Sequence, residues 1–393
     1  MTRKIILFAL LLFAAGCGRK MPLPVEEDRG EIPFSGYFVY GSWENVGNVT
    51  DILVTENQWL FFAEDSATVT RYRRKGANEG GKLVARAIGT LKDLERPLYL
   101  DEGAEDHLVI LDLHEEAMPV PPDSTETRPV FRPVVRIYDL FSETYVGSWS
   151  DTSWTPIDSF YRFPGRDSAK STRTIRAATP TAIAADPEDR VYVTAFSLRY
   201  RQKVLRLYDT TYTESGRIES LTPIGADTSY ADTLQAWSIR AYDARGAFLG
   251  TAAGDGTGLG YGREIRDAAL SPSYLFFVDG SMGRVKVNAA RGESQGIEWL
   301  DGSEITEPAE AVPFVLDPSG LAVDPLGSLY LSDGGNGRVL KYTSALRYRE
   351  RVDRNAADLL SAPGALAATD SLVYVFDHAG PKVVLFELPK AEK

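Results

Sequence analysis

Apolar and polar residues alternate with a period of two along most of the chain from residue 36 to residue 388. The alternating runs are rich in Val, Ile, Leu, Tyr and Phe, and Gly, Asp or Asn separates each run from the next. Apolar positions spaced by 3.6 residues, which would indicate helices, are hard to find. The pattern therefore predicts an all-β protein.

The clearest repeat unit covers residues 320–342 and contains three short strands. Residues 320–324 and 329–333 are apolar runs separated by Pro325 to Ser328, a segment with turn chemistry. Residues 334–337 supply glycines for a second turn, and residues 338–342 form the third run. Each run ends at a turn after about five residues, which predicts a small antiparallel sheet.

This unit resembles an NHL repeat, the blade of a class of β-propellers. The resemblance rests on the Gly-Leu-Ala-Val-Asp strand, the Leu-Tyr-Leu-Ser-Asp strand and the Arg-Val strand that follow one another here. Asn336, Gly337 and Arg338 stand where the family has Asn-His-Leu. The resemblance implies a ring of four-stranded blades around a central channel.

Weaker copies of the unit predict a six-bladed propeller formed by one domain, residues 36–388. Their first or second strands begin near residues 51, 98, 182, 268 and 364. Six units give about 59 residues per blade, more than the usual 40 to 50, so insertions are expected. One is Pro-rich, at residues 119–124, and the other is an inserted hairpin at residues 199–235. A seventh blade in the hairpin would need four strands from about 26 residues, which is too few.

An additional strand at residues 36–43 precedes the first unit, and the last unit has only three strands. Open sheet edges invite pairing with other chains, so a propeller closes its ring. The N-terminal strand is therefore expected to be the outer strand of the last blade.

The first 35 residues read as a leader and a tether. Arg3 and Lys4 precede eleven apolar residues, Ile5 to Ala15, which fits a secretory signal and is too short to span a bilayer as a helix. The run ends in Ala-Ala-Gly before Cys17, which resembles a bacterial lipobox. The resemblance implies cleavage after residue 16, acyl chains on Cys17 and a flexible tether at residues 17–35. The alternative is a signal cut by another peptidase, with Cys17 left as a free thiol.

The lipobox resemblance also implies a location. A lipid anchor on Cys17 places the protein on the bilayer of a bacterial cell envelope, and Gly18, where Asp would signal inner-membrane retention, favours the outer membrane. Acyl chains would provide the attachment, since each buried methylene contributes about 0.8 kcal/mol.

Charge and cysteine content exclude several classes of protein. The chain has 43 basic and 55 acidic residues, a net charge of −12, which argues against nucleic acid as a partner. Removal of residues 1–16 takes away Arg3 and Lys4 and no acidic residue, so the mature chain carries −14. A single cysteine excludes an intramolecular disulfide and a Cys-rich metal site.

One face of the predicted propeller collects acidic residues at the ends of second strands. The strands of a blade run alternately up and down. The turn after the second strand therefore lies on the same face of the propeller as the segment that leads into the first strand. A carboxylate in such a turn commonly accepts hydrogen bonds from backbone amides instead of binding a ligand. The candidate binding residues on this face are Asp65, Asp112, Asp279, Asp333, Asn336, Arg338, Asp377 and His378.

A metal site is a further candidate. Asp112, His114 and Glu116 alternate along one extended segment, which could bring three ligands together. Alternating polar residues are equally typical of a strand face in water.

Two classes of function remain. The first is a non-catalytic, membrane-anchored binding or scaffold module for a protein, peptide or glycan. The second is a calcium-dependent hydrolase resembling lactonases, or a lyase, with carboxylates around Ca²⁺ in the central channel. The sequence shows no repeated set of inward-pointing ligands, and this favours the binding module.

Overall fold

The computed structural model describes residues 36–388, apart from residues 65–66, 80–81, 105, 120–126, 155–156, 163–169, 256–260, 263, 272–273, 281–283, 290–298, 301–314, 344–347 and 357. The described chain is all-β, with three short 3-10 turns, η1 (Thr152–Trp154), η2 (Gly334–Asn336) and η3 (Arg354–Ala356). Within these residues no helix has the length and apolar character needed to cross a membrane.

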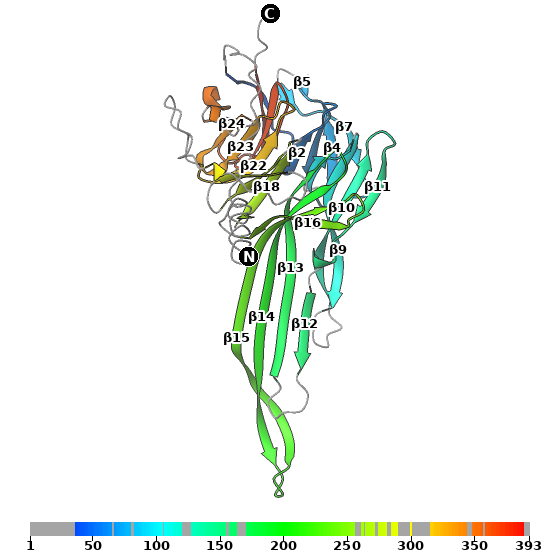
Figure 1. The fold of residues 1–393 in the computed structure, drawn as a ribbon, viewed down its shortest axis with the longest axis vertical. Helices are drawn as coiled ribbons and strands as arrows, with labels where there is room; N and C mark the ends of the chain where they lie inside the picture. Colours follow the sequence, from blue (N-terminus) through cyan, green and yellow to red (C-terminus); the bar gives the residue numbers. More distant parts are fainter. Residues whose placement is uncertain are drawn as a thin grey trace, which may run out of the picture.

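The protein is a β-propeller with five four-stranded blades (Figure 1). The first blade contains β2 (Val49–Val54), β3 (Leu60–Glu64), β4 (Thr68–Tyr72) and β7 (Ala87–Leu91). The second contains β8 (Pro97–Glu102), β9 (His107–Pro119), β10 (Thr127–Asp139) and β11 (Thr144–Trp149). The third contains β18 (Ile265–Leu270), β19 (Tyr274–Asp279), β20 (Arg284–Ala289) and β21 (Trp299–Leu300). The fourth contains β22 (Pro318–Val323), β23 (Leu329–Asp333), β24 (Arg338–Tyr342) and β25 (Tyr348–Arg351). The fifth contains β26 (Pro363–Ala368), β27 (Leu372–Asp377), β28 (Lys382–Glu387) and β1 (Phe38–Trp43). A small hairpin of β5 (Ala77–Glu79) and β6 (Lys82–Val84) joins β4 to β7.

The prediction of six blades, with seven as its alternative, is wrong, because one of the predicted units is a different kind of sheet. It is a six-stranded sheet, called here the extended sheet, made of β12 (Ile157–Arg162), β13 (Lys170–Ala185), β14 (Val191–Tyr212), β15 (Ile218–Tyr242), β16 (Phe248–Asp255) and β17 (Tyr261–Gly262). Its central strands have 16, 22 and 25 residues, whereas typical strands have five or six. The inner end of β13 lies between β8 and β18, so the extended sheet stands in the ring between the second and third blades.

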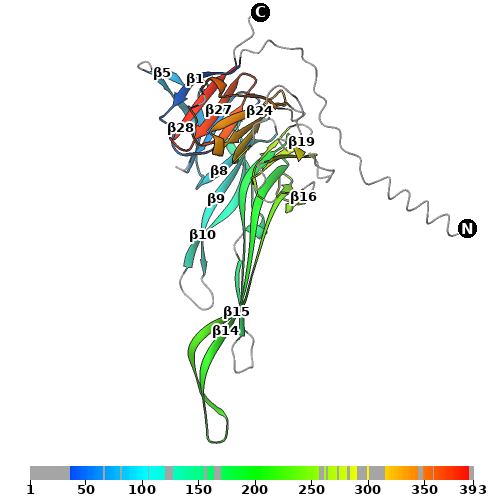
Figure 2. The same ribbon diagram turned by 90° about the vertical axis from the view of Figure 1, so that its left-hand side faces the viewer.

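The strands of the extended sheet continue far beyond the ring as an arm (Figures 1 and 2). β14 and β15 pair antiparallel from Val191↔Tyr242 to Tyr212↔Ile218. The predicted hairpin at residues 199–235 is therefore the outer part of two ring strands. At about 3.3 Å per residue, the residues of β14 beyond Ser197 extend roughly 50 Å. β9 and β10 form a second, shorter projection on the same side of the ring.

The N-terminal strand closes the last blade, as the sequence predicts. β1 pairs antiparallel with β28, from Phe38↔Glu387 to Trp43↔Val383. Trp43 is fully buried, with its ring centroid 6.0 Å from that of Phe62 and 6.1 Å from that of Tyr374. The indole thus joins the closing strand to both the first and the fifth blade.

The core lies between neighbouring blades, where the faces of their sheets pack together. The second strands of three blades, β3, β23 and β27, are buried at every residue. Strands covered on both faces read as continuous apolar runs, which explains Leu-Phe-Phe-Ala in β3 and Leu-Val-Tyr-Val-Phe in β27. The inner strands β22 and β26 approach closely. A side chain at position 320 would overlap the carbonyl oxygen of Gly364, so this position requires glycine.

Candidate functional site

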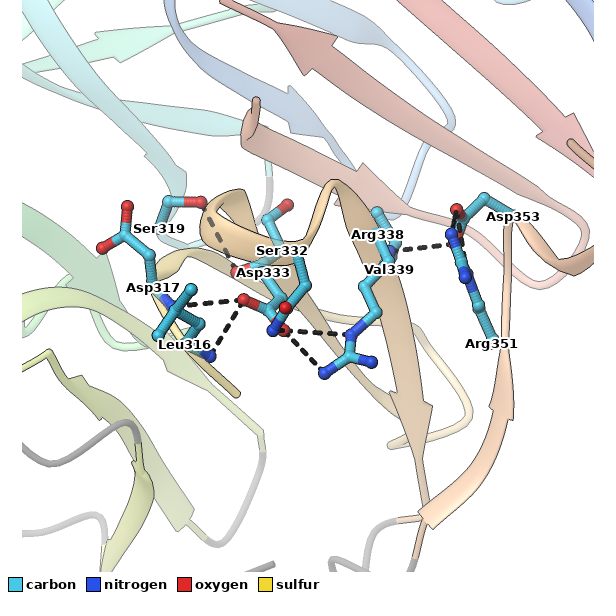
Figure 3. Close-up of polar contacts among 10 residues, drawn as sticks. Leu316, Asp317, Ser319, Ser332, Asp333, Arg338, Val339, Arg351 and Asp353 are labelled. Atoms are coloured by element: carbon cyan, nitrogen blue, oxygen red, sulfur yellow. Dashed lines mark hydrogen bonds and ion pairs between the residues drawn. The ribbon is translucent and has the colours of Figure 1, made fainter. Parts of the chain in front are cut away.

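The acidic residues at the ends of second strands are buried and hydrogen-bonded. Asp112, Asp279, Asp333 and Asp377 are each at most 1% exposed. Asp333 Oδ1 accepts hydrogen bonds from the backbone N–H groups of Leu316 and Asp317, both at 3.1 Å (Figure 3). These two residues lead into the first strand of the same blade. The carboxylate therefore joins the turn after the second strand to the entry of the first.

The same arrangement recurs in two other blades. Asp112 Oδ1 accepts from the N–H of Arg96 at 2.7 Å, and Asp377 Oδ1 from the N–H of Ala362 at 2.8 Å. In all three blades the next residue is a proline that begins the first strand, where its missing N–H costs no ladder bond. The amide donors thus come from about 16 residues earlier in the chain, not from the turn itself.

A basic residue on the third strand completes each of these clusters. In the fourth blade, Arg338 lies with Nε 3.0 Å and Nη2 2.9 Å from Asp333 Oδ2, and Asn336 donates to the same oxygen at 2.7 Å. Gly337 between them has φ +58°, the left-handed region that favours glycine. Asp333 thus has both oxygens engaged, and the Asn-Gly-Arg segment of the repeat has a structural explanation. A role for these residues in binding stays a prediction.

Two predicted face residues do not belong to these clusters as the structure describes them. His378 is exposed, lies against Gly364 and meets the ring of Phe376 edge-on at a centroid distance of 4.8 Å. Asp65 lies outside the described residues.

The predicted metal ligands are brought together only in part. His114 Nε2 lies 3.1 Å from Asp112 Oδ2, but Glu116 pairs with Arg132 at 3.0 Å. Arg136 occupies the remaining side of the cluster, with Nε 3.3 Å from Asp112 Oδ2. A cation-bearing side chain there competes with a metal ion for the carboxylate. In the part of the chain that the structure describes, no group of three or more acidic, His or Cys residues has a metal-binding arrangement.

Three further carboxylates, absent from the residues predicted from the sequence, lie on inner strands. Asp51 is the third residue of β2, Asp267 the third of β18 and Asp101 the fifth of β8. β2 and β18 are separated by two inner strands in either direction around the ring, so Asp51 and Asp267 occupy opposite positions. The signal that could have found them is a single Asp inside an otherwise apolar or small-residue strand.

Each inner carboxylate joins two neighbouring inner strands. Asp51 accepts from its neighbour Ile52 N–H at 2.8 Å and from Leu100 N–H in β8 at 2.7 Å. In the same way Asp101 accepts from the N–H of Ala185 in β13, and Asp267 from the N–H of Leu321 in β22. The first strands of the blades are edge strands, and β12 pairs with β13 only at residues 171–176, so the outward amides of these inner strands lack ladder partners. The carboxylates satisfy these amides and hold adjacent sheets together around the axis.

Burial raises the pKa of all three inner carboxyl groups. The loss of solvation is the main cause, and the other inner acids add to the rise for Asp51 and Asp101. The pKa of Asp101 and of Asp267 is raised to about 7, and that of Asp51 well above its usual value. Hydrogen bonds from the amides oppose the rise but do not cancel it. Groups with such pKa values can carry protons near neutral pH, but both oxygens of each already accept backbone hydrogen bonds.

Comparison with solved structures finds chains of low sequence identity. Solved structures with a similar course of the chain include a nidogen/laminin complex, with 14% identity, 84% of this chain and 89% of that chain covered and a TM-score of 0.46. A streptogramin B lyase has 10% identity, covers 91% of this chain and 100% of its own, and has a TM-score of 0.46. Regucalcin from Agrobacterium tumefaciens, described as a calcium-binding protein, has 11% identity, coverages of 92% and 98% and a TM-score of 0.43.

None of the curated proteins matches the chain. The family model of the NHL repeat matches residues 316–342, which include the first three strands of the fourth blade. The chain therefore contains an NHL repeat within an all-β propeller.

Proposed function

We propose that this protein is a non-catalytic binding module of the bacterial cell envelope, and that the arm of the extended sheet engages a protein partner. The observation that carries the proposal is the arm itself, which is far longer than ring closure requires. Elaborated connections on a rigid scaffold are where binding residues concentrate. The projection of β9 and β10 on the same side of the ring adds a second elaborated element to that face.

The arm has an open edge that could accept a strand from a partner. β15 pairs with β14 along its length but with β16 only from Ile239 onward. Residues 218–238 therefore have one edge without a strand partner within the described chain. Strand addition to such an edge supplies main-chain hydrogen bonds, while side chains on the edge select the partner.

The described side chains of the arm include exposed apolar groups. Tyr212 and Ile218, paired at the end of the hairpin, are 60% and 41% exposed, and Leu234 on the open edge is 54% exposed. Residues 218–238 carry three acidic residues, Glu219, Asp227 and Asp232, and no basic one. Two copies of this edge would repel each other, so a strand that carries Lys or Arg is the better fit.

The inner carboxylates support binding in preference to catalysis. A hydrolase or lyase with a central metal needs carboxylate oxygens that are open to that metal. Here both carboxylate oxygens of Asp51, Asp101 and Asp267 accept hydrogen bonds from backbone N–H groups of two adjacent strands. Their arrangement is accounted for by closure of the ring.

Attachment to the membrane through Cys17 belongs to the same proposal. Residues 1–35 lie outside the described part of the chain, and the support for a lipid anchor is the lipobox-like sequence before Cys17. Cys17→Ser should move the protein from the membrane to the soluble fraction of the cells. Membrane association that survives this substitution would remove the anchor from the proposal.

The partner proposal is tested by shortening the arm without disturbing the ring. Leu198 and Gln235 are register partners, so Asn-Gly can replace residues 199–234 as a two-residue turn. In capture from native envelopes, the full chain should retain a specific protein that the shortened chain does not. A photocrosslinker at position 234 should react with that protein, whereas one at the exposed position 326, in the turn between β22 and β23, should not. Equal capture by the shortened chain, with its unfolding transition preserved, would refute a role for the arm.

A further inference from the structure

A small basic hollow lies at the end of the first blade away from the arm. It has a volume of about 260 Å³ and lies between the turn after β2, the end of β4 and the start of β7. Turns after first and third strands lie at the opposite end of a blade from the turns that carry the projections. In both views β5, which follows β4, lies at the end of the molecule away from the arm (Figures 1 and 2).

The hollow is strongly cationic in an acidic protein. Arg71, Arg73 and Arg74 line it, and its lining contains no acidic residue. The surrounding sequence, residues 68–92, holds seven Lys or Arg residues and a single acidic residue, Glu79, although the whole chain has a net charge of −12. Such local concentration of one sign of charge attracts ions of the opposite sign.

Three of the residues that line the hollow have a buried polar atom without a partner. Nε of Arg71 and of Arg74, and Oε1 of Gln58, have no hydrogen-bond partner among the described residues. Buried polar groups are nearly always satisfied, and each exception calls for an explanation such as a missing ligand or ion. Gln58 also has φ +65°, a conformation that a residue other than glycine rarely adopts.

An aromatic wall and an apolar wall complete the hollow. The guanidinium carbon of Arg71 lies 4.7 Å from the centroid of the Trp59 ring, which holds the cation in place by a cation–π contact. Ile88, which also lines the hollow and is half-exposed, supplies an apolar surface. A guanidinium held in this way loses less conformational freedom when it binds an anion than one that moves freely in solvent.

We infer that the hollow is a binding site for a small oxyanion, a phosphate group carried by a soluble molecule or by a lipid headgroup. Guanidinium groups match the oxygens of such anions with paired N–H donors. Nε of Arg71 and of Arg74 has no partner among the described residues, while Nη2 of Arg74 donates to Thr369 Oγ1 at 3.5 Å. The volume is below the 300–1,000 Å³ typical of drug-sized ligands, which fits a single anionic group with a short attachment. This site is separate from the arm and does not depend on the proposed protein partner.

In the first test, the full-length chain bearing Cys17→Ser is titrated with inorganic phosphate. Binding is measured from the Nε–Hε NMR signals of the arginine side chains. Phosphate should shift the signals of two arginines in a saturable way, and Arg71→Gln and Arg74→Gln should each remove one signal and weaken binding at least tenfold. Arg245→Gln, which removes an exposed arginine from the turn between β15 and β16, should change binding less than twofold. Unchanged binding in the Arg71→Gln/Arg74→Gln double variant, with the unfolding transition preserved, would overturn the inference.

A second arm of the test distinguishes the sources of the anion. The same protein is mixed with vesicles of phosphatidylglycerol and, as the control, of phosphatidylcholine. Binding to phosphatidylglycerol that the double variant loses, and that millimolar phosphate does not displace, assigns the site to a lipid headgroup. Displacement by free phosphate assigns it to a soluble ligand. Absence of saturable binding to both inorganic phosphate and the anionic vesicles would overturn the inference.

Discussion

The inner carboxylates should make the protein more stable at mildly acidic than at neutral pH. The pKa of Asp101 and of Asp267 is about 7 in the folded chain, compared with an ordinary value of 3.8. Between these values the folded state binds more protons than the unfolded state, so the free energy of unfolding rises as pH falls. The stabilisation is complete below the unfolded pKa and is lost as pH rises through about 7.

The magnitude follows from the size of the shift. One pKa unit corresponds to about 1.4 kcal/mol, and integration from pH 7 to pH 6 gives about 1 kcal/mol for each group, or about 2 kcal/mol for the pair. Solvent that reaches these half-buried groups lowers this figure. Glu102 and Glu350, whose pKa values burial also raises to about 7, change stability in the same direction.

Urea unfolding between pH 5.5 and pH 8 measures the effect. Asp101→Asn and Asp267→Asn should each reduce the change in unfolding free energy between pH 7 and pH 6 by about 1 kcal/mol. This reduction is expected whatever the effect of the substitution on stability at a single pH. Glu214→Gln, which removes an exposed carboxyl from the turn at the end of the arm, should leave the slope unchanged. Slopes for the two Asn variants that match the Glu214→Gln slope would refute a raised pKa for these residues.

Three substitutions test the packing of the ring by the same urea measurement. Asp333→Ala breaks a buried ion pair and leaves backbone amides unsatisfied, so it should cost about 3–5 kcal/mol, whereas the exposed Asp370→Ala should cost under about 0.5 kcal/mol. Gly320→Ala should cost about 1–3 kcal/mol by overlap between two inner strands, and Gly250→Ala, where the new methyl group meets open space, should cost nothing measurable. Trp43→Ala removes the side chain that joins the closing strand to two blades and should cost about 3–5 kcal/mol. A loss under 1 kcal/mol for Asp333→Ala, Gly320→Ala or Trp43→Ala would contradict the contact that the substitution removes.

The alternation of apolar and polar residues was sufficient to predict strands and ring closure. Residues 36–43 could be assigned to the last blade because a propeller leaves no open edge, and β1 pairs with β28 as expected. The number of blades could not be obtained in this way. Alternation has the same period in a ring strand and in a free-standing hairpin, so it does not reveal where β14 and β15 leave the ring.

The candidate sites were harder to predict because their chemistry depends on partners far away in the sequence. Asp333 could be recognised at the end of a strand, but its amide donors lie 16 and 17 residues earlier. Asp51 is likewise explained only by the N–H of Leu100 in the next blade. The basic hollow had a local signal, the run from Arg71 to Lys75, which the net charge of the whole chain conceals.

The pairing of β1 with β28 has a consequence for the order of events during synthesis. Phe38 leaves the ribosome early, but its partner Glu387 is made only when nearly the whole domain has been translated. Contacts between such distant residues form slowly, because the loop between them must close first. Until then the fifth blade lacks its outer strand and its edge at β28 stays open. A chaperone or a secretion pathway that delays folding until the last strand has emerged would spare the protein this exposed intermediate.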